Sequence, residues 1–201
     1  MIKIILFDCD GLVIKRDKYF SLRLAETGKN LDMKKIRDFF KNRFLFCETG
    51  QADLKEELER RIKDWGFDGS LEELLDFWFS GEADTDKQML NYIEGLRQKG
   101  SKCYLATNNE KHRVNYLLDR VVGLGKHFDG CFASCDLGYL KDQKEFWEGV
   151  SKISGNDNLS EVLVWDDDIK NVESAKAFGY NAELYSDFDG FKNKMKEYGF
   201  N

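Results

Sequence analysis

Two aspartates near the start of the sequence stand where they could do acid–base or metal chemistry. Asp8 and Asp10 flank a cysteine directly after an apolar run at residues 2–7. Later segments add further polar side chains after or close to apolar runs: Thr107 and Asn108, Lys141, and Asp166 and Asp167. Carboxylates brought together repel one another and raise one another's pKa unless a cation neutralises them. Mg²⁺, a hard cation that takes oxygen ligands and keeps positions for water and phosphate, fits such a set.

The order of apolar and amphipathic segments predicts how these side chains are positioned. Short apolar runs at residues 2–7, 102–106, 128–133 and 161–165, with a weaker one at 182–185, are typical of buried strands. Helical patterns lie between or after them, at residues 86–99, 110–121, 142–153, 171–178 and 188–198. This alternation predicts an α/β protein with a doubly wound parallel sheet covered on both faces. Ligands of such sheets bind beyond the carboxyl ends of the strands, so the polar segments are expected to meet at one edge.

Residues 17–85 interrupt that alternation. Amphipathic patterns near residues 19–26, 33–42, 53–65 and 71–79 predict successive helices, and no strand pattern falls among them. A helical block inserted directly after the first strand is typical of a lid or cap rather than of the core. We therefore expect a core made of residues 1–16 and 86–201, and an all-helical cap made of residues 17–85.

Each polar residue alone also has a purely structural interpretation. An aspartate after a strand is most often a turn or helix-cap residue, and Asp168 fits that role just before a predicted helix. Thr107 could cap the helix that starts near residue 110, and Lys141 could be a solvated lysine at a helix end. The combination of carboxylates, hydroxyl and lysine at one sheet edge is what favours a functional site.

The charge balance of the chain narrows the classes of ligand. With 31 basic and 37 acidic residues, the net charge is −6, and no basic block stands out. Such a chain binds nucleic acid and anionic membrane surfaces poorly, so we expect neither partner. No apolar run resembles a membrane span or a signal peptide, and the five cysteines fit a reduced, cytoplasmic setting.

Four motifs connect the sequence to a known family. They are "LFDCDG" at residues 6–11, "YLATNN" at 104–109, "LGYLKD" at 137–142 and "VLVWDDDIKNVESAKAFG" at 162–179. In this order, each at or after a predicted strand end, they resemble the motifs of the haloacid dehalogenase (HAD) superfamily of hydrolases. The resemblance covers the whole predicted core, and the helical block matches the position of the family's C1-type cap.

The resemblance implies a covalent mechanism carried by the first motif. Asp8 would be the nucleophile that attacks phosphorus and forms an aspartyl-phosphate. Asp10 would protonate the leaving oxygen and then deprotonate the hydrolytic water. The implied magnesium ligands are Asp8, the backbone carbonyl of Asp10, Asp167 and, alongside or instead of it, Asp166. The groups implied to hold the phosphoryl oxygens are Thr107, Asn108 and Lys141.

The same family includes dehalogenases, and Asp10 separates the two activities, because displacing halide from carbon needs no acid for the leaving group. We therefore predict an Mg²⁺-dependent phosphatase that acts on a small soluble phosphomonoester resembling a sugar phosphate. A phosphomutase shares all four motifs and stays open, as does a catalytically inactive regulator that binds a phosphorylated metabolite. A phosphoacceptor signalling domain fits less well, because such domains lack a long helical insertion.

The predicted cap says little about the substrate. Its aromatic residues are expected to form its own core: Trp65, Phe67, Phe77, Trp78 and Phe79. Arg43 and Glu48 are the polar cap residues that we select as candidate substrate contacts. His112, in the helix after the second motif, is expected to be structural.

Overall fold

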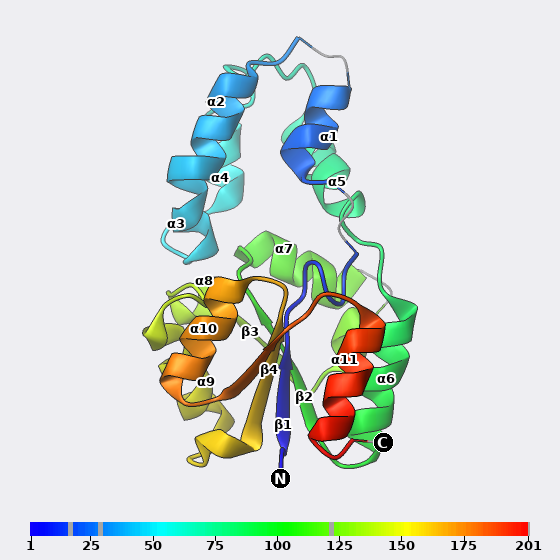
Figure 1. Cartoon of the computed structure of the whole chain (residues 1–201). Helices are drawn as coiled ribbons and strands as arrows, with labels where there is room; N and C mark the ends of the chain where they lie inside the picture. The colour runs from blue at the N-terminus through cyan, green and yellow to red at the C-terminus, as the bar shows by residue number, and fades with distance from the viewer. Residues whose placement is uncertain (16–17, 28–29, 121–122, 201) are drawn as a thin grey trace.

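The computed structural model describes residues 1–15, 18–27, 30–120 and 123–200, and it confirms the predicted doubly wound sheet. Within these residues the sheet has five strands, all paired in parallel, in the order β3-β2-β1-β4-β5. The strands are β1 (Ile4–Phe7), β2 (Lys102–Thr107), β3 (Gly130–Ala133), β4 (Val162–Asp166) and β5 (Asn181–Leu184). The strand carrying the first motif is therefore central, and its end lies between those of β2 and β4 (Figure 1).

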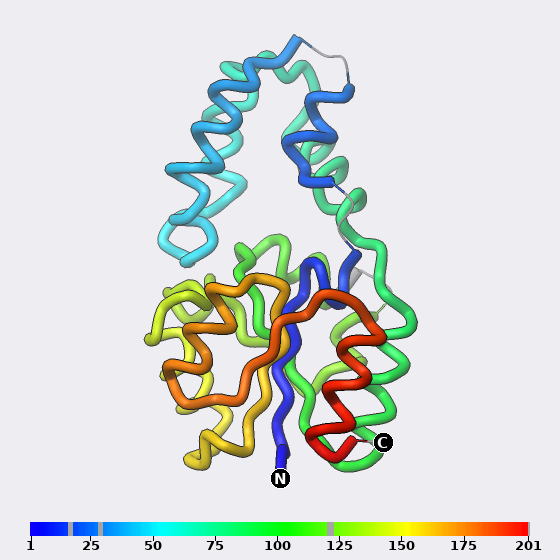
Figure 2. The backbone as a smooth tube through the Cα atoms, in the orientation of Figure 1, coloured from blue at the N-terminus to red at the C-terminus, as the bar shows by residue number. Residues whose placement is uncertain are grey.

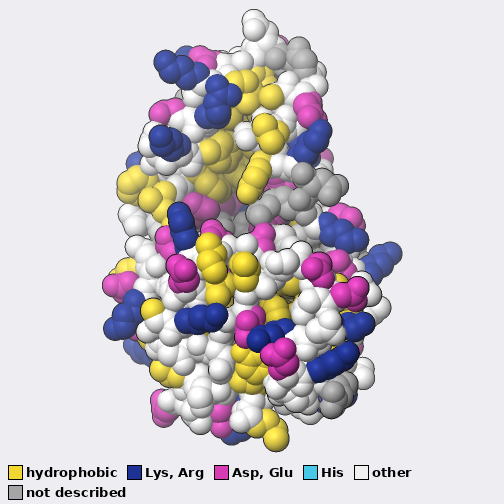
Figure 3. Space-filling model, in the orientation of Figure 1, with side chains coloured by type: hydrophobic (Ala, Val, Ile, Leu, Met, Phe, Trp, Pro, Cys, Tyr) yellow, Lys and Arg dark blue, Asp and Glu magenta, His cyan; other side chains and the backbone are white. Residues whose placement is uncertain are grey.

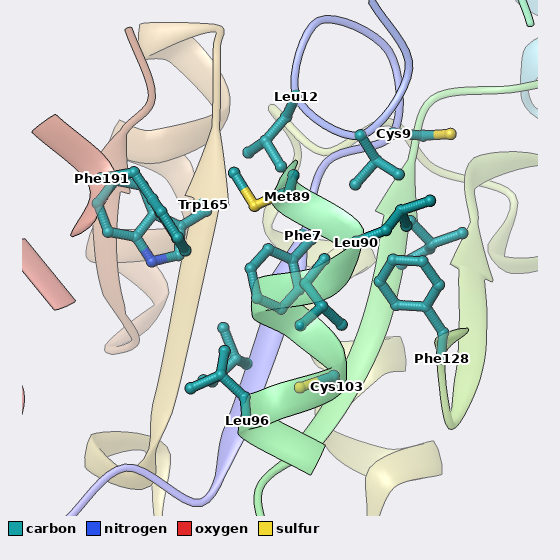
Figure 4. Packing of buried hydrophobic residues seen from close by; sticks show 14 of the residues in the cluster. Phe7, Cys9, Leu12, Met89, Leu90, Leu96, Cys103, Phe128, Trp165 and Phe191 are labelled. Atoms are coloured by element: carbon teal, nitrogen blue, oxygen red, sulfur yellow. The ribbon is translucent and has the colours of Figure 1, made fainter. Parts of the chain in front are cut away.

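Helices cover both faces of the sheet, because each parallel crossover must pass over one face. On one face α6 (Lys87–Gln98) and α11 (Phe188–Glu197) lie side by side (Figures 1 and 2). They enclose a cluster in which Met89 and Phe191 pack with Phe7 and Trp165 (Figure 4). The other face is covered by α9 (Lys144–Ser154) and α10 (Ile169–Phe178), whose Phe146 belongs to a second buried cluster.

The elements that follow β2 and β3 lie at the edge where the site is expected. After β2 comes α7 (Lys111–Asn115), which continues as a π-helical segment, Tyr116–Arg120. The helix predicted over residues 110–121 therefore changes its hydrogen-bond pattern midway, and its last residue lies outside the described residues. After β3 comes a short helix that the sequence did not predict, α8 (Ser134–Leu137).

Between β1 and β2 the described chain forms only helices, turns and loops apart from two isolated bridges, and we call the helices α1–α5 the helical insert. They are α1 (Phe20–Glu26), α2 (Met33–Asp38), α3 (Phe44–Glu48), α4 (Leu54–Glu59) and α5 (Leu71–Ser80), and a π-helical segment, Phe39–Arg43, joins α2 to α3. The predicted helix over residues 53–65 is shorter than expected, because turns replace it after Glu59. The insert packs around its own aromatic cluster, which contains Trp65, Phe67, Trp78 and Phe79 as predicted, with Phe77 at its edge.

The insert forms two arms that rise from the carboxyl edge of the sheet, one made of α2, α3 and α4 and the other of α1 and α5 (Figures 1 and 2). The two connections to the core are hydrogen-bonded to each other. Ile14 forms an antiparallel bridge with Thr85, and the backbone N–H of Lys15 donates to the carbonyl of Asp84 at 2.8 Å. The predicted boundary between residues 16 and 17 lies outside the described residues, and the division at residues 85 and 86 stays a prediction.

Among the residues that the structure describes, no helix combines the length and the apolar character needed to cross a membrane.

Candidate active site

A buried lysine connects two of the predicted site segments. Lys141 Nζ donates to Asp8 Oδ1 at 2.6 Å and to Asp166 Oδ2 at 2.7 Å. The three side chains are 2 %, 9 % and 1 % exposed, so these charges are removed from water. Lys141 is therefore not the solvated lysine of the structural interpretation. It lies between two carboxylates at the carboxyl ends of the adjacent strands β1 and β4.

Burial and charge act against each other in this cluster. Burial raises the pKa of Asp8 well above its usual value, Lys141 opposes that rise, and the carboxylates of Asp166 and Asp167 add to it. Burial acts to lower the pKa of Lys141, but Asp8 and Asp166 outweigh it, and the net direction is upward. The lysine is thus held as a cation by its two carboxylate partners.

Three carboxylates of this cluster fit a metal ion. One oxygen each from Asp8, Asp166 and Asp167 lies within 4.8 Å of the others. Mg²⁺ prefers such hard oxygen ligands and is held in proteins by few carboxylates, with water and substrate phosphate in the remaining positions. The side chain of Asp10 does not belong to this group. Its implied contribution was the backbone carbonyl, and that assignment stays a prediction.

The residues around Asp166 hold its carboxylate in place. Asp166 Oδ1 accepts hydrogen bonds from Asn171 Nδ2 and from the backbone N–H of Asp168, both at 2.9 Å. Asp168 itself is the N-cap of α10, as its structural interpretation predicted, because its side chain accepts the backbone N–H of Lys170. Each oxygen of Asp166 therefore has a donor, and the carboxylate has little freedom to turn away from the site.

Asp10 lies beyond the end of the strand and has its own set of partners. Strand β1 ends at Phe7, so the two-residue alternation that would place Asp8 and Asp10 on one side does not extend to them. Asp10 Oδ2 accepts from Asn109 Nδ2 at 2.7 Å, and Oδ1 accepts from Arg113 Nη2 at 3.1 Å. The two aspartates of the first motif are therefore held by different groups.

Arg113 was not predicted from the sequence. Its side chain is only 3 % exposed, and it also donates to the backbone carbonyls of Phe79 and Glu82, where the helical insert returns to the core. In the sequence it is one charged residue in a short helix rich in charge, so no signal separates it from a solvated arginine. In the structure it connects Asp10 to the end of α5 and the segment after it.

The predicted phosphate-binding residues contact the partners of Asp10 and the loop that carries Lys141. Thr107 is 2 % exposed, and its Oγ1 accepts from Asn109 Nδ2 at 2.7 Å. It does not cap α7, because Glu110 takes that position. Asn108 Oδ1 accepts the backbone N–H of Lys141 at 2.9 Å and so positions the loop that carries the lysine. Asn109, left out of the predicted site, joins Thr107 to Asp10.

The helical insert contacts the core beside the site through the end of α3. Ser134 Oγ donates to the backbone carbonyl of Glu48 at 2.6 Å. A Cβ atom at Gly50 would lie 2.2 Å from the carbonyl oxygen of Cys135, so the two backbones approach as closely as a glycine permits. Burial raises the pKa of the Glu48 carboxyl to about 7.

Two other polar residues that the sequence singled out, Arg43 and His112, contact carboxylates of the chain itself. Arg43 Nε and Nη2 donate to the two carboxylate oxygens of Glu57, both at 2.8 Å, and Glu57 is buried inside the insert. This contact gives Arg43 a structural role, and its role as a substrate contact stays a prediction. His112 Nε2 lies 2.9 Å from Asp53 Oδ2, which joins α7 to the N-cap of α4 and agrees with the structural role expected for it.

Solved structures share this fold. An HAD family enzyme from Bacteroides thetaiotaomicron, BT-2542, aligns with a TM-score of 0.81 at 20% identity, covering 95% of this chain and 98% of that one. The same enzyme in complex with magnesium and inorganic phosphate aligns with a TM-score of 0.79 at 20% identity, over 95% and 99% of the chains. A predicted HAD-like hydrolase from Porphyromonas gingivalis aligns with a TM-score of 0.76 at 20% identity, over 100% and 99%. No curated protein sequence matches the chain.

At these identities the solved structures establish the fold alone. The family model reaches further, because it matches residues 2–179, which contain every motif described above. The chain belongs to the haloacid dehalogenase-like hydrolases.

Proposed function

We propose that this protein is an Mg²⁺-dependent phosphatase that hydrolyses a small soluble phosphomonoester through an aspartyl-phosphate on Asp8. The observation that carries the proposal is the buried cluster in which Lys141 contacts both Asp8 and Asp166, with Asp167 beside them and Asp10 held separately. Solved HAD neighbours bound to magnesium and phosphate support the choice of metal and ligand. The reduced cytoplasm stays the proposed compartment.

The hydrogen bonds of Asp8 support different roles for its two oxygens. Oδ1 accepts from Lys141 Nζ at 2.6 Å and from the backbone N–H of Cys9 at 2.7 Å. We assign Oδ2 to the attack on phosphorus, in line with the leaving oxygen. The new bond joins Oδ2 to phosphorus as the bond from phosphorus to the leaving oxygen breaks.

Asp10 moves the proton in both steps. It gives a proton to the leaving oxygen in the first step, and takes one from the water that attacks phosphorus in the second. The second step breaks the bond to Asp8 and releases inorganic phosphate. Lys141, Thr107 and Asn108 would hold the phosphoryl oxygens. Mg²⁺ held by Asp8, Asp166 and Asp167 would supply positive charge against the charge that develops on those oxygens.

The distinguishing experiment measures phosphate release from sugar phosphates, nucleotides and small acid phosphates with and without Mg²⁺. We expect turnover that EDTA suppresses reversibly and that Asp8→Asn abolishes. Asp168→Asn is the matched control, because asparagine caps a helix as well as aspartate does and Asp168 lies outside the metal group. Full turnover by Asp8→Asn, or in EDTA, would contradict the mechanism.

The same screen separates the alternatives. A phosphomutase converts its substrate into an isomer with little phosphate release, because the phosphoryl group returns to the substrate. A catalytically inactive regulator binds a phosphorylated metabolite and leaves it intact. A dehalogenase releases halide from a haloacid and has no use for the acid that we assign to Asp10.

A further inference from the structure

A cavity of about 210 Å³ lies between the two arms of the helical insert. Aromatic rings form most of its wall, with one serine and one carboxylate among them: Tyr19, Phe20, Ser21, Phe40, Phe44, Trp78 and Glu82. They come from the start of α1, from the π-helical segment with the start of α3, and from α5 with the residues after it. Figure 3 shows hydrophobic side chains gathered between the arms, above the core.

The aromatic wall is one continuous packed surface. The ring centroid of Trp78 lies 4.7 Å from that of Phe20, in a stacked arrangement, and 5.3 and 5.5 Å from those of Phe40 and Phe44. Phe20 and Trp78 are buried, whereas Phe40 and Phe44 are half-buried and line the open space. A packed aromatic wall presents flat faces and edges to an occupant and few hydrogen-bonding groups.

Glu82 places this cavity on the side of Asp10. A single atom, Arg113 Nη2, donates both to the backbone carbonyl of Glu82 and to Asp10 Oδ1. Glu82, which lines the cavity, is therefore connected to the proposed acid through the side chain of Arg113. A group that receives a proton from Asp10 is on the leaving-group side of phosphorus, so the cavity is where a leaving group would extend.

We infer that this cavity binds the leaving group of the substrate, and that this group is an uncharged planar ring, such as an aromatic or heteroaromatic alcohol. The inference rests on the proposed phosphatase function and replaces the sugar-phosphate-like ester expected from the sequence with a different substrate class. A cavity of about 150 Å³ accommodates a benzene ring, so this volume has room for a substituted ring.

The lining disfavours the other common classes of leaving group. A sugar brings several hydroxyl groups against a lining whose polar side chains are Tyr19, Ser21 and Glu82. Each hydroxyl that leaves water without a new hydrogen-bond partner weakens binding. A second phosphate or a carboxylate would lie near the carboxylate of Glu82, which Trp78 Nε1 already contacts at 3.0 Å. A flat apolar ring keeps the aromatic wall in contact and leaves that hydrogen bond intact.

Esters of primary alcohols test the inference without changing the chemistry of the leaving oxygen. We expect kcat/KM for benzyl phosphate to exceed that for glucose 6-phosphate by more than about tenfold, and that for cyclohexylmethyl phosphate by about two- to tenfold, the range set by aromatic contact geometry. Methyl phosphate, which has no ring, measures the phosphoryl-transfer step alone. Equal values for the three larger esters would overturn the inference and leave the phosphatase function standing.

Matched variants assign any preference to this cavity. Phe44→Leu keeps an apolar side chain at the wall but removes a ring face, so it should lower kcat/KM for benzyl phosphate by about two- to tenfold relative to that for methyl phosphate. Phe77→Leu is the control, because Phe77 belongs to the same aromatic cluster and packs on Phe20 but does not line the cavity. Equal losses in the two variants would refute the assignment.

A binding measurement separates failure of this inference from failure of the proposed function. Benzylphosphonate and methylphosphonate cannot be hydrolysed, and their Kd values in Mg²⁺ are measurable whether or not the protein turns over a substrate. Tighter binding of benzylphosphonate that Phe44→Leu weakens and Phe77→Leu does not would support the cavity even if no ester were hydrolysed. Equal Kd values for the two phosphonates would overturn it.

Discussion

Replacing Lys141 by methionine tests whether the ammonium group holds the carboxylate cluster together. Methionine is close to lysine in length and apolar volume, so Lys141→Met removes mainly the charge. Asp8 and Asp166 would then face each other in the interior without the cation that each now contacts at 2.6 and 2.7 Å. Removing one partner of a buried ion pair costs about 3–5 kcal/mol, so we expect the free energy of unfolding in EDTA to fall by about that amount.

Mg²⁺ should return part of that stability, because it binds the folded cluster and brings positive charge to the same carboxylates. A ligand at a hundred times its Kd stabilises the folded state by about 2.7 kcal/mol. Urea unfolding in EDTA and in Mg²⁺ measures both effects. Lys144→Met is the matched control, since Lys144 pairs with Glu148 at 2.6 Å but on the surface, where the two side chains are 70% and 48% exposed.

Two results would refute this reasoning. The first is a Lys141→Met protein whose free energy of unfolding in EDTA stays within about 0.5 kcal/mol of the unchanged protein, the range of ordinary surface substitutions. The second is a loss of the same size in EDTA and in saturating Mg²⁺. That outcome would mean that the charge of Lys141 does not interact with the metal group, and that the lysine contributes to stability independently of the metal.

Three further changes test other parts of the structure. Arg113→Lys should lower kcat on alkyl phosphomonoesters by up to about 10²-fold with little change in KM, because the shorter side chain misplaces Asp10. Arg23→Lys is the control in the same assay, because it loses similar contacts to backbone carbonyls of α5. Glu57→Gln should lower the free energy of unfolding above about pH 4.5, because Arg43 favours the charged form of Glu57 and lowers its pKa. The difference from the unchanged protein should fade as the pH falls through that lowered pKa. Urea unfolding across this range measures the difference, and a difference that is independent of pH would count against the pairing. Gly50→Ala should lower the melting temperature more than Gly100→Ala, because both glycines have positive φ but only Gly50 faces a backbone carbonyl, that of Cys135. Equal shifts in melting temperature would contradict the close approach of Gly50 to Cys135.

The sequence predicted the sheet and most of the site because their signals are local. The apolar run before Asp8 marks β1, and a run of the same kind before Asp166 marks β4, which pairs with it. Strand alternation with helices then puts their carboxyl ends at one edge, and Lys141 reaches both carboxylates there. Once the sheet is known, the meeting of these groups follows from topology.

The partners of Asp10 could not be predicted in the same way. Arg113 meets it across 103 positions of sequence and is one charged residue in a helix that looks solvated. The sequence also places Arg43 among candidate substrate contacts, because nothing local shows that Glu57, fourteen residues away, is buried and needs a cation. Both contacts escape prediction for the same reason, since the burial of a charged side chain depends on which elements pack over it.

The paired connections between residues 13–15 and 84–86 have a consequence for how this chain could be rebuilt. Because the N–H of Lys15 donates to the carbonyl of Asp84, the two ends of the helical insert are held together where they join the core. The entropy of closing a loop rises only with the logarithm of its length, so a short turn or another folded unit could join these two positions at similar cost. The insert could therefore be exchanged for another unit, so that the same proposed catalytic aspartates would serve substrates of different specificity.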